Sequence, residues 1–268
     1  MPLQLSDAMF LCPGMAKVIS GIRNEHRLAL ELVEDLNMFG NRQLFATHLS
    51  RTNLQQVLVS SLLPRLLTAL QASVLTGERG LSAETKLITR KVLEVTFRIV
   101  AIARSEEVAK KYLQSDEQNR KKFLNKLRLL KSVRHTSEDL AKIEALHADA
   151  TEKIVVYDIK DLTIEWYARQ ADLIDMYNTA YALLSESAHA NVRDLENLLE
   201  MDAGGNIEAL RYGPDPNGLS EDLSIGIECV ILSLEAAFTL LPGCDTEGLK
   251  RLRERMMSLF SELDKSET

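Results

Sequence analysis

The sequence predicts an all-α protein, an irregular multi-helix bundle with one small hairpin arm. Apolar residues recur at spacings of three and four along most of the 268-residue chain, which is the period of a helix. Capping residues and helix breakers divide this pattern into closely connected helices. Hydrophobic residues form 46% of the chain and charged residues 26%, a composition typical of an ordinary globular protein. The length is near the upper limit for one hydrophobic core, so we expect a single domain over residues 1–268.

The first helical region begins at Met15 and carries one apolar seam. Its members follow each other at alternating spacings of four and three: Met15, Ile19, Ile22, His26, Ala29, Val33 and Leu36. We interpret His26 as a hydrogen-bonded core residue, because a lone histidine in a seam is more often that than a ligand. The next segment, 42–75, is predicted to be a long helix or a helix pair, with a kink or break at Pro64.

Serine and threonine residues mark the starts of the following helices. The predicted caps are Ser82, Ser105, Ser115 and Thr136 or Ser137. Ser82 opens a helix that runs to about Arg104, and Ser115 with Gln118 has the form of a capping box.

Glycine and proline dominate one stretch of the C-terminal half. We expect a long helix over 171–201, followed by a loop at 202–218 in which residues 206–212 form a small hairpin arm. Two further helices are predicted, one ending at Leu241 and one over 246–263.

Cysteine spacing and hydropathy favour a cytoplasmic protein. Cys12, Cys229 and Cys244 form none of the close pairs found in metal or redox sites, so each is expected to be a buried or inert thiol. Pro13 and Gly14 interrupt the first apolar stretch, which argues against a secretory leader. We expect no membrane span, because no window reaches the roughly 18 apolar residues that a span requires.

Charge is distributed unevenly along the chain. The formal net charge is −7, which argues against a general nucleic-acid coat protein. Segment 104–135 nevertheless holds ten Lys or Arg against four Asp or Glu, a net charge of +6. One interpretation is a solvated helix face in an acidic protein, and the alternative is a docking surface for an anionic partner.

Two charged residues interrupt a predicted buried surface. The helix that starts at Ser82 has an apolar seam and a second seam one residue out of phase, on which Arg90 and Glu94 lie one turn apart. A charged pair in such a place needs partners, because a buried unpaired ion is costly. The simplest interpretation is a mutual ion pair at a helix contact.

The helix predicted over 171–201 could supply further partners. Tyr177, Tyr181, Ser185 and His189 recur every four residues, so they form a polar strip along it. Tyrosine and histidine can bury ring area and still present a hydrogen-bonding atom. If the strip meets Arg90, the arginine would hold an anionic or carbonyl group, Glu94 would orient it or act as a base, and His189 would titrate near neutral pH.

These motifs carry a resemblance to a known family. The helix Arg90-x-x-x-Glu94, the segment 104–112, the strip from Tyr181 to His189 and the arm at Gly213-Pro214 resemble a bacterial helical family, a domain of unknown function with the catalogue number five-six-seven-seven. The resemblance covers about residues 82–241, with residues 1–80 as an N-terminal helical extension packed on that core. It implies an all-helical fold and no established activity. The shared polar cluster that it implies contains six residues: Arg90, Glu94, Tyr112, Tyr181, Ser185 and His189.

Two functions follow from this cluster. The first is a binding or interaction module that recognises a small ligand or a partner segment. The alternative is a ribonuclease-like toxin or other hydrolase that uses His189 with Arg90. Helical toxin ribonucleases place an arginine a few residues before the histidine, whereas Ser185 and two leucines occupy these positions here. No residue is therefore assigned as catalytic.

Metal and cofactor sites are not predicted. Glu144-x-x-His147 has the spacing of a di-metal bundle motif, but no other histidine repeats it. No phosphate loop, dinucleotide fingerprint or nucleophile elbow occurs, so we expect no cofactor. Met256, Met257 and Phe260 are expected to be exposed on the last helix, which suggests a homodimer.

Overall fold

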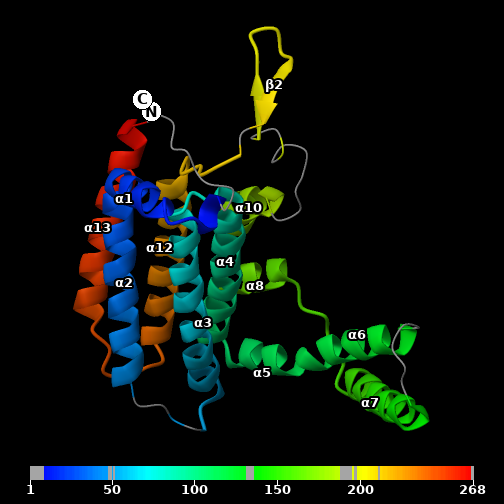
Figure 1. The fold of residues 1–268 in the computed structure, drawn as a ribbon. Coiled ribbons are helices and arrows are strands. Elements are labelled where there is room, and N and C mark those ends of the chain that lie inside the picture. The colour runs from blue at the N-terminus through cyan, green and yellow to red at the C-terminus, as the bar shows by residue number, and fades with distance from the viewer. Residues whose placement is uncertain are drawn as a thin grey trace.

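The computed structural model confirms an all-α fold with one small hairpin (Figure 1). It describes residues 9–47, 50, 52–130, 136–187, 195, 198–210 and 212–266.

Five long helices stand side by side and form the main bundle. They are α2 (Arg27–Ala46), α3 (Leu54–Gly77), α4 (Ser82–Arg104), α12 (Leu219–Phe238) and α13 (Thr246–Ser266). α12 contacts each of the other four, and α3 and α4 pack closely along each other. The buried apolar side chains of these helices belong to one hydrophobic core cluster. The subdivision into 1–80 and 82–241 stays a prediction.

The N-terminal seam divides into two helices at His26. α1 spans Met15–Glu25, and His26 has φ −100° and ψ 27°, outside the helical range, before α2 begins. The Nδ1 atom of His26 lies 2.9 Å from the Oγ atom of Ser220 on α12. His26 is therefore a hydrogen-bonded residue at the edge of the core, as interpreted from the sequence.

α3 continues through Pro64 without a break in the helix. Its length and hydropathy reach those of a membrane-spanning helix, so the expectation that no segment does so is wrong by these criteria. A core helix meets the same criteria, and Leu63, Leu66 and Leu70 of α3 are fully buried inside the bundle. The absence of a membrane span stays a prediction.

Three helices form an arm that projects from the foot of the bundle. α5 (Glu106–Gln114) leads away from α4, and α6 (Asp116–Leu129) and α7 (Ser137–Val156) pack on each other beyond it (Figure 1). The predicted capping box at Ser115 is wrong, because its hydroxyl donates to the carbonyl of Tyr112 instead. α7 does begin with a capping box, at Thr136, which is one of the two residues predicted to open this helix.

The segment after α7 consists of short helical pieces packed beside α4. These are α8 (Ile164–Ala171), α9 (Ile174–Met176), the π-helix η2 (Tyr177–Tyr181) and α10 (Ala182–Ser187). The single helix predicted over 171–201 is therefore wrong. Asp172 interrupts it with φ 60°, and its last residues belong to a strand.

The hairpin starts earlier than the predicted 202–218. Strands β1 (Leu199–Met201) and β2 (Ile207–Leu210) pair antiparallel, with Leu199 opposite Leu210. Asp202 lies in the turn between them and accepts hydrogen bonds from the backbone of Gly204 and Asn206. The hairpin projects from the bundle on the end opposite to α5 (Figure 1).

The C-terminal helix corrects one expectation about exposure. Met256 is buried in the core, Phe260 packs partly against it and Met257 is exposed. The pattern that suggested a homodimer is therefore mostly a core-facing seam, and the dimer stays a prediction. Cys12 and Cys229 are buried, and Cys244 is half-buried.

Candidate functional site

Arg90 and Glu94 of α4 meet the polar strip of η2 and α10. The Nε atom of Arg90 donates to Ser185 Oγ at 2.9 Å, and its Nη2 atom donates to the hydroxyl of Tyr181 at 2.5 Å. The same hydroxyl donates to Glu94 Oε1 at 3.2 Å, which lies 3.4 Å from Nη1 of Arg90. We call these four residues the Arg90 cluster. The structure thus brings together four of the six residues proposed from the sequence.

Tyr181 is the buried centre of the Arg90 cluster. Its ring stacks on that of Tyr177 with centroids 5.0 Å apart and lies 6.2 Å from the ring of Phe97. Burial raises the pKa of Tyr181, and the negative charge of Glu94 raises it further, against the opposing charge of Arg90. The phenol is therefore held in its neutral form. The π-helical turn places Tyr177 and Tyr181 in this stack, and such turns occur often at functional sites.

Glu94 joins the Arg90 cluster to two further cations. Its Oε2 atom lies 3.3 Å from Lys91 Nζ and 3.7 Å from Arg98 Nη1. The carboxylate is largely buried, with 14% of its side chain exposed. One carboxylate therefore pairs with three positive side chains on the same helix, so this face of α4 has an excess of positive charge.

The other two predicted residues are not part of this contact. His189 lies outside the described residues. Tyr112 of α5 lines a neighbouring pocket and packs edge-on against Tyr167, with ring centroids 6.1 Å apart.

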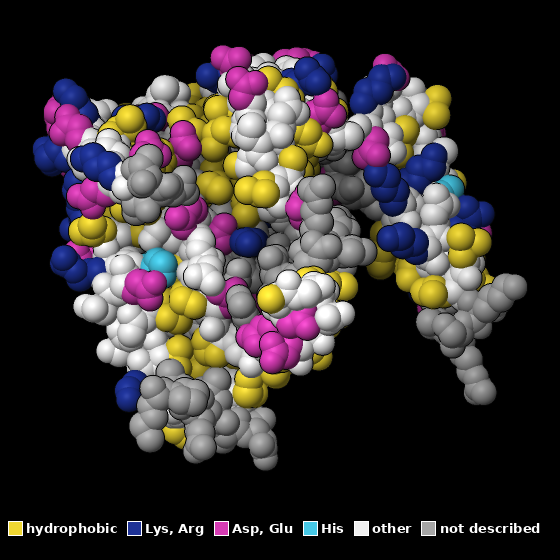
Figure 2. Space-filling view, turned by 90° about the horizontal axis from the view of Figure 1, so that it is seen from above, with side chains coloured by type: hydrophobic (Ala, Val, Ile, Leu, Met, Phe, Trp, Pro, Cys, Tyr) yellow, Lys and Arg dark blue, Asp and Glu magenta, His cyan; other side chains and the backbone are white. Residues whose placement is uncertain are grey.

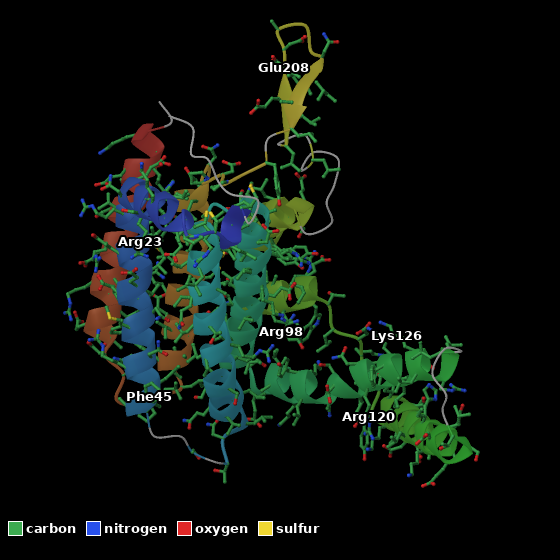
Figure 3. All side chains as sticks on the ribbon, viewed as in Figure 1. Arg23, Phe45, Arg98, Arg120, Lys126 and Glu208 are labelled. Atoms are coloured by element: carbon green, nitrogen blue, oxygen red, sulfur yellow. The ribbon has the colours of Figure 1, made fainter. Side chains whose placement is uncertain are left out.

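That pocket opens between α4 and the base of the arm, and we call it the Arg98 pocket. Its cavity volume is about 340 Å³. Arg98, labelled in Figure 3, lines this pocket, and its guanidinium carbon lies 5.5 Å from the centroid of the Tyr167 ring. The lining residues are Leu62, Arg65, Lys91, Val95, Arg98, Tyr112, Ser115, Asn119, Leu162 and Tyr167.

Sequence reasoning missed most of this pocket. Arg98 follows Glu94 by one helical turn, so the same spacing that paired Arg90 with Glu94 could have included it. Arg65 and Tyr167 come from distant helices, and no local pattern connects them to α4.

The comparison with protein families identifies the chain. Residues 56–207 match the Family of unknown function (DUF5677). The chain belongs to this family. The match begins within α3 and ends at the start of β2, so it contains both the Arg90 cluster and the Arg98 pocket. Searches of curated proteins and of solved structures gave no match. The bacterial source and the cytoplasmic location stay predictions.

The family-matched region also contains the basic segment 104–135. Figure 2 shows Lys and Arg side chains gathered on the arm at the right of the view. Many of them are already paired with acids: Arg104 with Asp172, Lys110 with Glu106, Lys111 with Glu107, Arg120 with Asp149, Lys122 with Asp161 and Arg128 with Glu144. Within the described residues, Lys121 and Lys126 have no ion-pair partner. The anionic partner at this segment stays a prediction, and the pairing favours the solvated-face interpretation.

Candidate metal ligands do not gather in the part of the chain that the structure describes. No group of three or more His, Cys, Asp or Glu residues there could hold a metal ion. Glu144, from the Glu144-x-x-His147 spacing, accepts a hydrogen bond from Arg128 at 2.8 Å.

Proposed function

We propose that this chain is a binding or interaction module, and that the Arg90 cluster belongs to its recognition site. The observation that carries the proposal is the fixed arginine, because Arg90 is held by Ser185, Tyr181 and Glu94 at once. An arginine restrained in this way loses little side-chain entropy when it binds a ligand. Its guanidinium has five N–H groups, so donors remain for an anionic or carbonyl group.

The hydrogen bonds of the cluster argue against catalysis. The hydroxyl of Ser185 donates to the carbonyl of Tyr181 at 2.6 Å and accepts from Arg90. A nucleophilic serine instead needs a base that takes its proton. Both carboxylate oxygens of Glu94 are already paired with positive side chains, so neither is free to contact a substrate.

One experiment compares ligand binding by purified variants. We expect at least one probe among succinate, inorganic phosphate and adenosine monophosphate to raise the midpoint of thermal unfolding, because a ligand that binds only the folded state stabilises it. The increase should be smaller in Ser185→Ala and Arg90→Gln, and unchanged in Arg251→Gln, an exposed charge on α13. No increase with any probe would contradict the proposal.

The alternative is a ribonuclease that uses His189 with Arg90. It predicts that the purified protein cleaves RNA, that its overexpression is toxic, and that His189→Ala removes both effects. We expect neither effect in the wild-type protein. RNA cleavage that is lost in His189→Ala would contradict the binding module and support the hydrolase.

A further inference from the structure

The Arg98 pocket is positively charged, and its cations are incompletely neutralised. Arg65, Lys91 and Arg98 line it, and none of its lining residues is Asp or Glu. Lys91 and Arg98 share the carboxylate of Glu94, which also pairs with Arg90. Arg65 has no ion-pair or hydrogen-bond partner among the residues that the structure describes. Three cations thus face one cavity beside a carboxylate that is already shared.

Neutral donors in the same pocket are free to contact a ligand. Within the described chain, the hydroxyl of Tyr112 and the side-chain amide of Asn119 form no hydrogen bonds. The hydroxyl of Tyr167 is different, because burial raises its pKa, and Ser115 beside it acts in the opposite direction. Ser115 in turn donates to the carbonyl of Tyr112 at 2.7 Å. Tyr167 and Ser115 therefore form a fixed wall, and Tyr112 and Asn119 supply the donors.

The volume and the lining of the pocket limit the size and the chemistry of its ligand. A cavity of about 340 Å³ lies near the lower end of the range of small-molecule sites. Leu62, Val95 and Leu162 give it an apolar part beside the charged part. A ligand that suits both parts combines a compact anionic group with a small organic group.

We propose that the Arg98 pocket binds the phosphate group of a small phosphate ester, with Arg65, Lys91 and Arg98 as its cationic contacts. A phosphate ester carries up to two negative charges and several acceptor oxygens, which matches three cations and two neutral donors better than a single carboxylate does. This inference rests on the proposed function, because it names the ligand class of the binding module. It concerns a pocket next to the Arg90 cluster and uses side chains that the cluster does not contain.

Calorimetric titration with inorganic phosphate at constant ionic strength tests the inference. We expect wild-type protein to bind phosphate, and Arg65→Gln and Lys91→Gln each to weaken binding at least fivefold. Both side chains are exposed, so their replacement should leave the fold intact. Arg251→Gln removes the same charge from α13, on the side of the bundle away from α8 (Figure 1), and should change binding less than twofold.

Three outcomes would overturn the inference. These are no phosphate binding, equal weakening by Arg251→Gln, and acetate binding as tight as phosphate binding. The last result would indicate a general attraction of anions. The binding module itself would survive each of them if succinate, which carries no phosphate, still raised the unfolding midpoint in wild type and raised it less in Ser185→Ala. Failure of every probe would instead remove both proposals.

Discussion

The hydroxyl of Tyr181 connects two charged side chains that also contact each other. It accepts from Arg90 and donates to Glu94, and its buried ring packs against those of Phe97 and Tyr177. Removing this oxygen leaves the ring packing in place but deprives both charged groups of a neutral partner. In a largely buried site, groups that lose a partner cannot easily replace it with water.

Tyr181→Phe should therefore reduce the free energy of unfolding by about 1–2 kcal/mol. The matched control is Tyr177→Phe, because the Tyr177 ring stacks on Tyr181 while its hydroxyl has no hydrogen-bond partner among the described residues. This control should cost less than about 0.5 kcal/mol. Urea unfolding measures the free energy of unfolding of both variants. Equal losses would show that the hydrogen bonds of the Tyr181 hydroxyl do not add to stability.

The turn between α3 and α4 fixes the loop that leads from the hairpin to α12. Gly80 has φ +70°, and its carbonyl accepts a hydrogen bond from the backbone N–H of Asp215 at 2.9 Å. A Cβ atom at Gly80 would lie 2.6 Å from the same nitrogen and 2.8 Å from Cα of Pro214. Two backbones therefore meet where only glycine fits.

Gly80→Ala should lower the free energy of unfolding by about 2–4 kcal/mol, because the left-handed conformation and the backbone contact both oppose a side chain. Gly213→Ala, in the contacted loop, is the control, since a Cβ atom there would have nothing within 4 Å. It should change stability by less than about 0.5 kcal/mol. A small effect of Gly80→Ala, with unchanged amide exchange in α12, would mean that the turn and the loop are not held together.

The core of the bundle contains a carboxyl group that opposes folding at neutral pH. Asp222 of α12 is 6% exposed. Burial raises its pKa from 3.8 to about 7, although the positive charge of Lys86 acts in the opposite direction. The folded protein thus binds this proton more tightly than the unfolded chain does. The stability linked to it is fully present below about pH 4 and is lost as the pH rises towards about 7.

Asp222→Asn should remove this loss of stability at high pH, because the asparagine amide stays neutral. Above pH 7 the variant should be more stable than wild type, by at most about 4 kcal/mol, and the difference should shrink as the pH falls to 5. Urea unfolding at pH 5 and pH 8 measures it. Glu221→Gln removes the charge of the exposed neighbour, and its stability relative to wild type should depend much less on pH. If Asp222→Asn and wild type were equally stable at pH 8, the charge of Asp222 would not oppose folding.

Local patterns predict much of the fold because helices form from nearby residues. The spacing of Val92, Val95 and Ile99 predicts the buried face of α4, and the structure places all three in the core. The capping serine of α5 is also found, since Ser105 accepts from the N–H of Val108. Breaks are harder to predict, because His26 and Asp172 leave the helical conformation in segments whose apolar spacing continues.

Helical spacing also identified Arg90, Glu94, Tyr181 and Ser185, because each pair lies one turn apart on its own helix. Their contact across α4 and η2 depends on how the helices pack, and it required the π-turn that no residue spacing indicates. The Arg98 pocket depends on packing alone, since Arg65, Arg98 and Tyr167 come from three helices. Short-range spacing along the chain therefore sets helices and their polar faces, whereas the meeting of distant faces is set by long-range packing, which determines the charge and shape of a pocket.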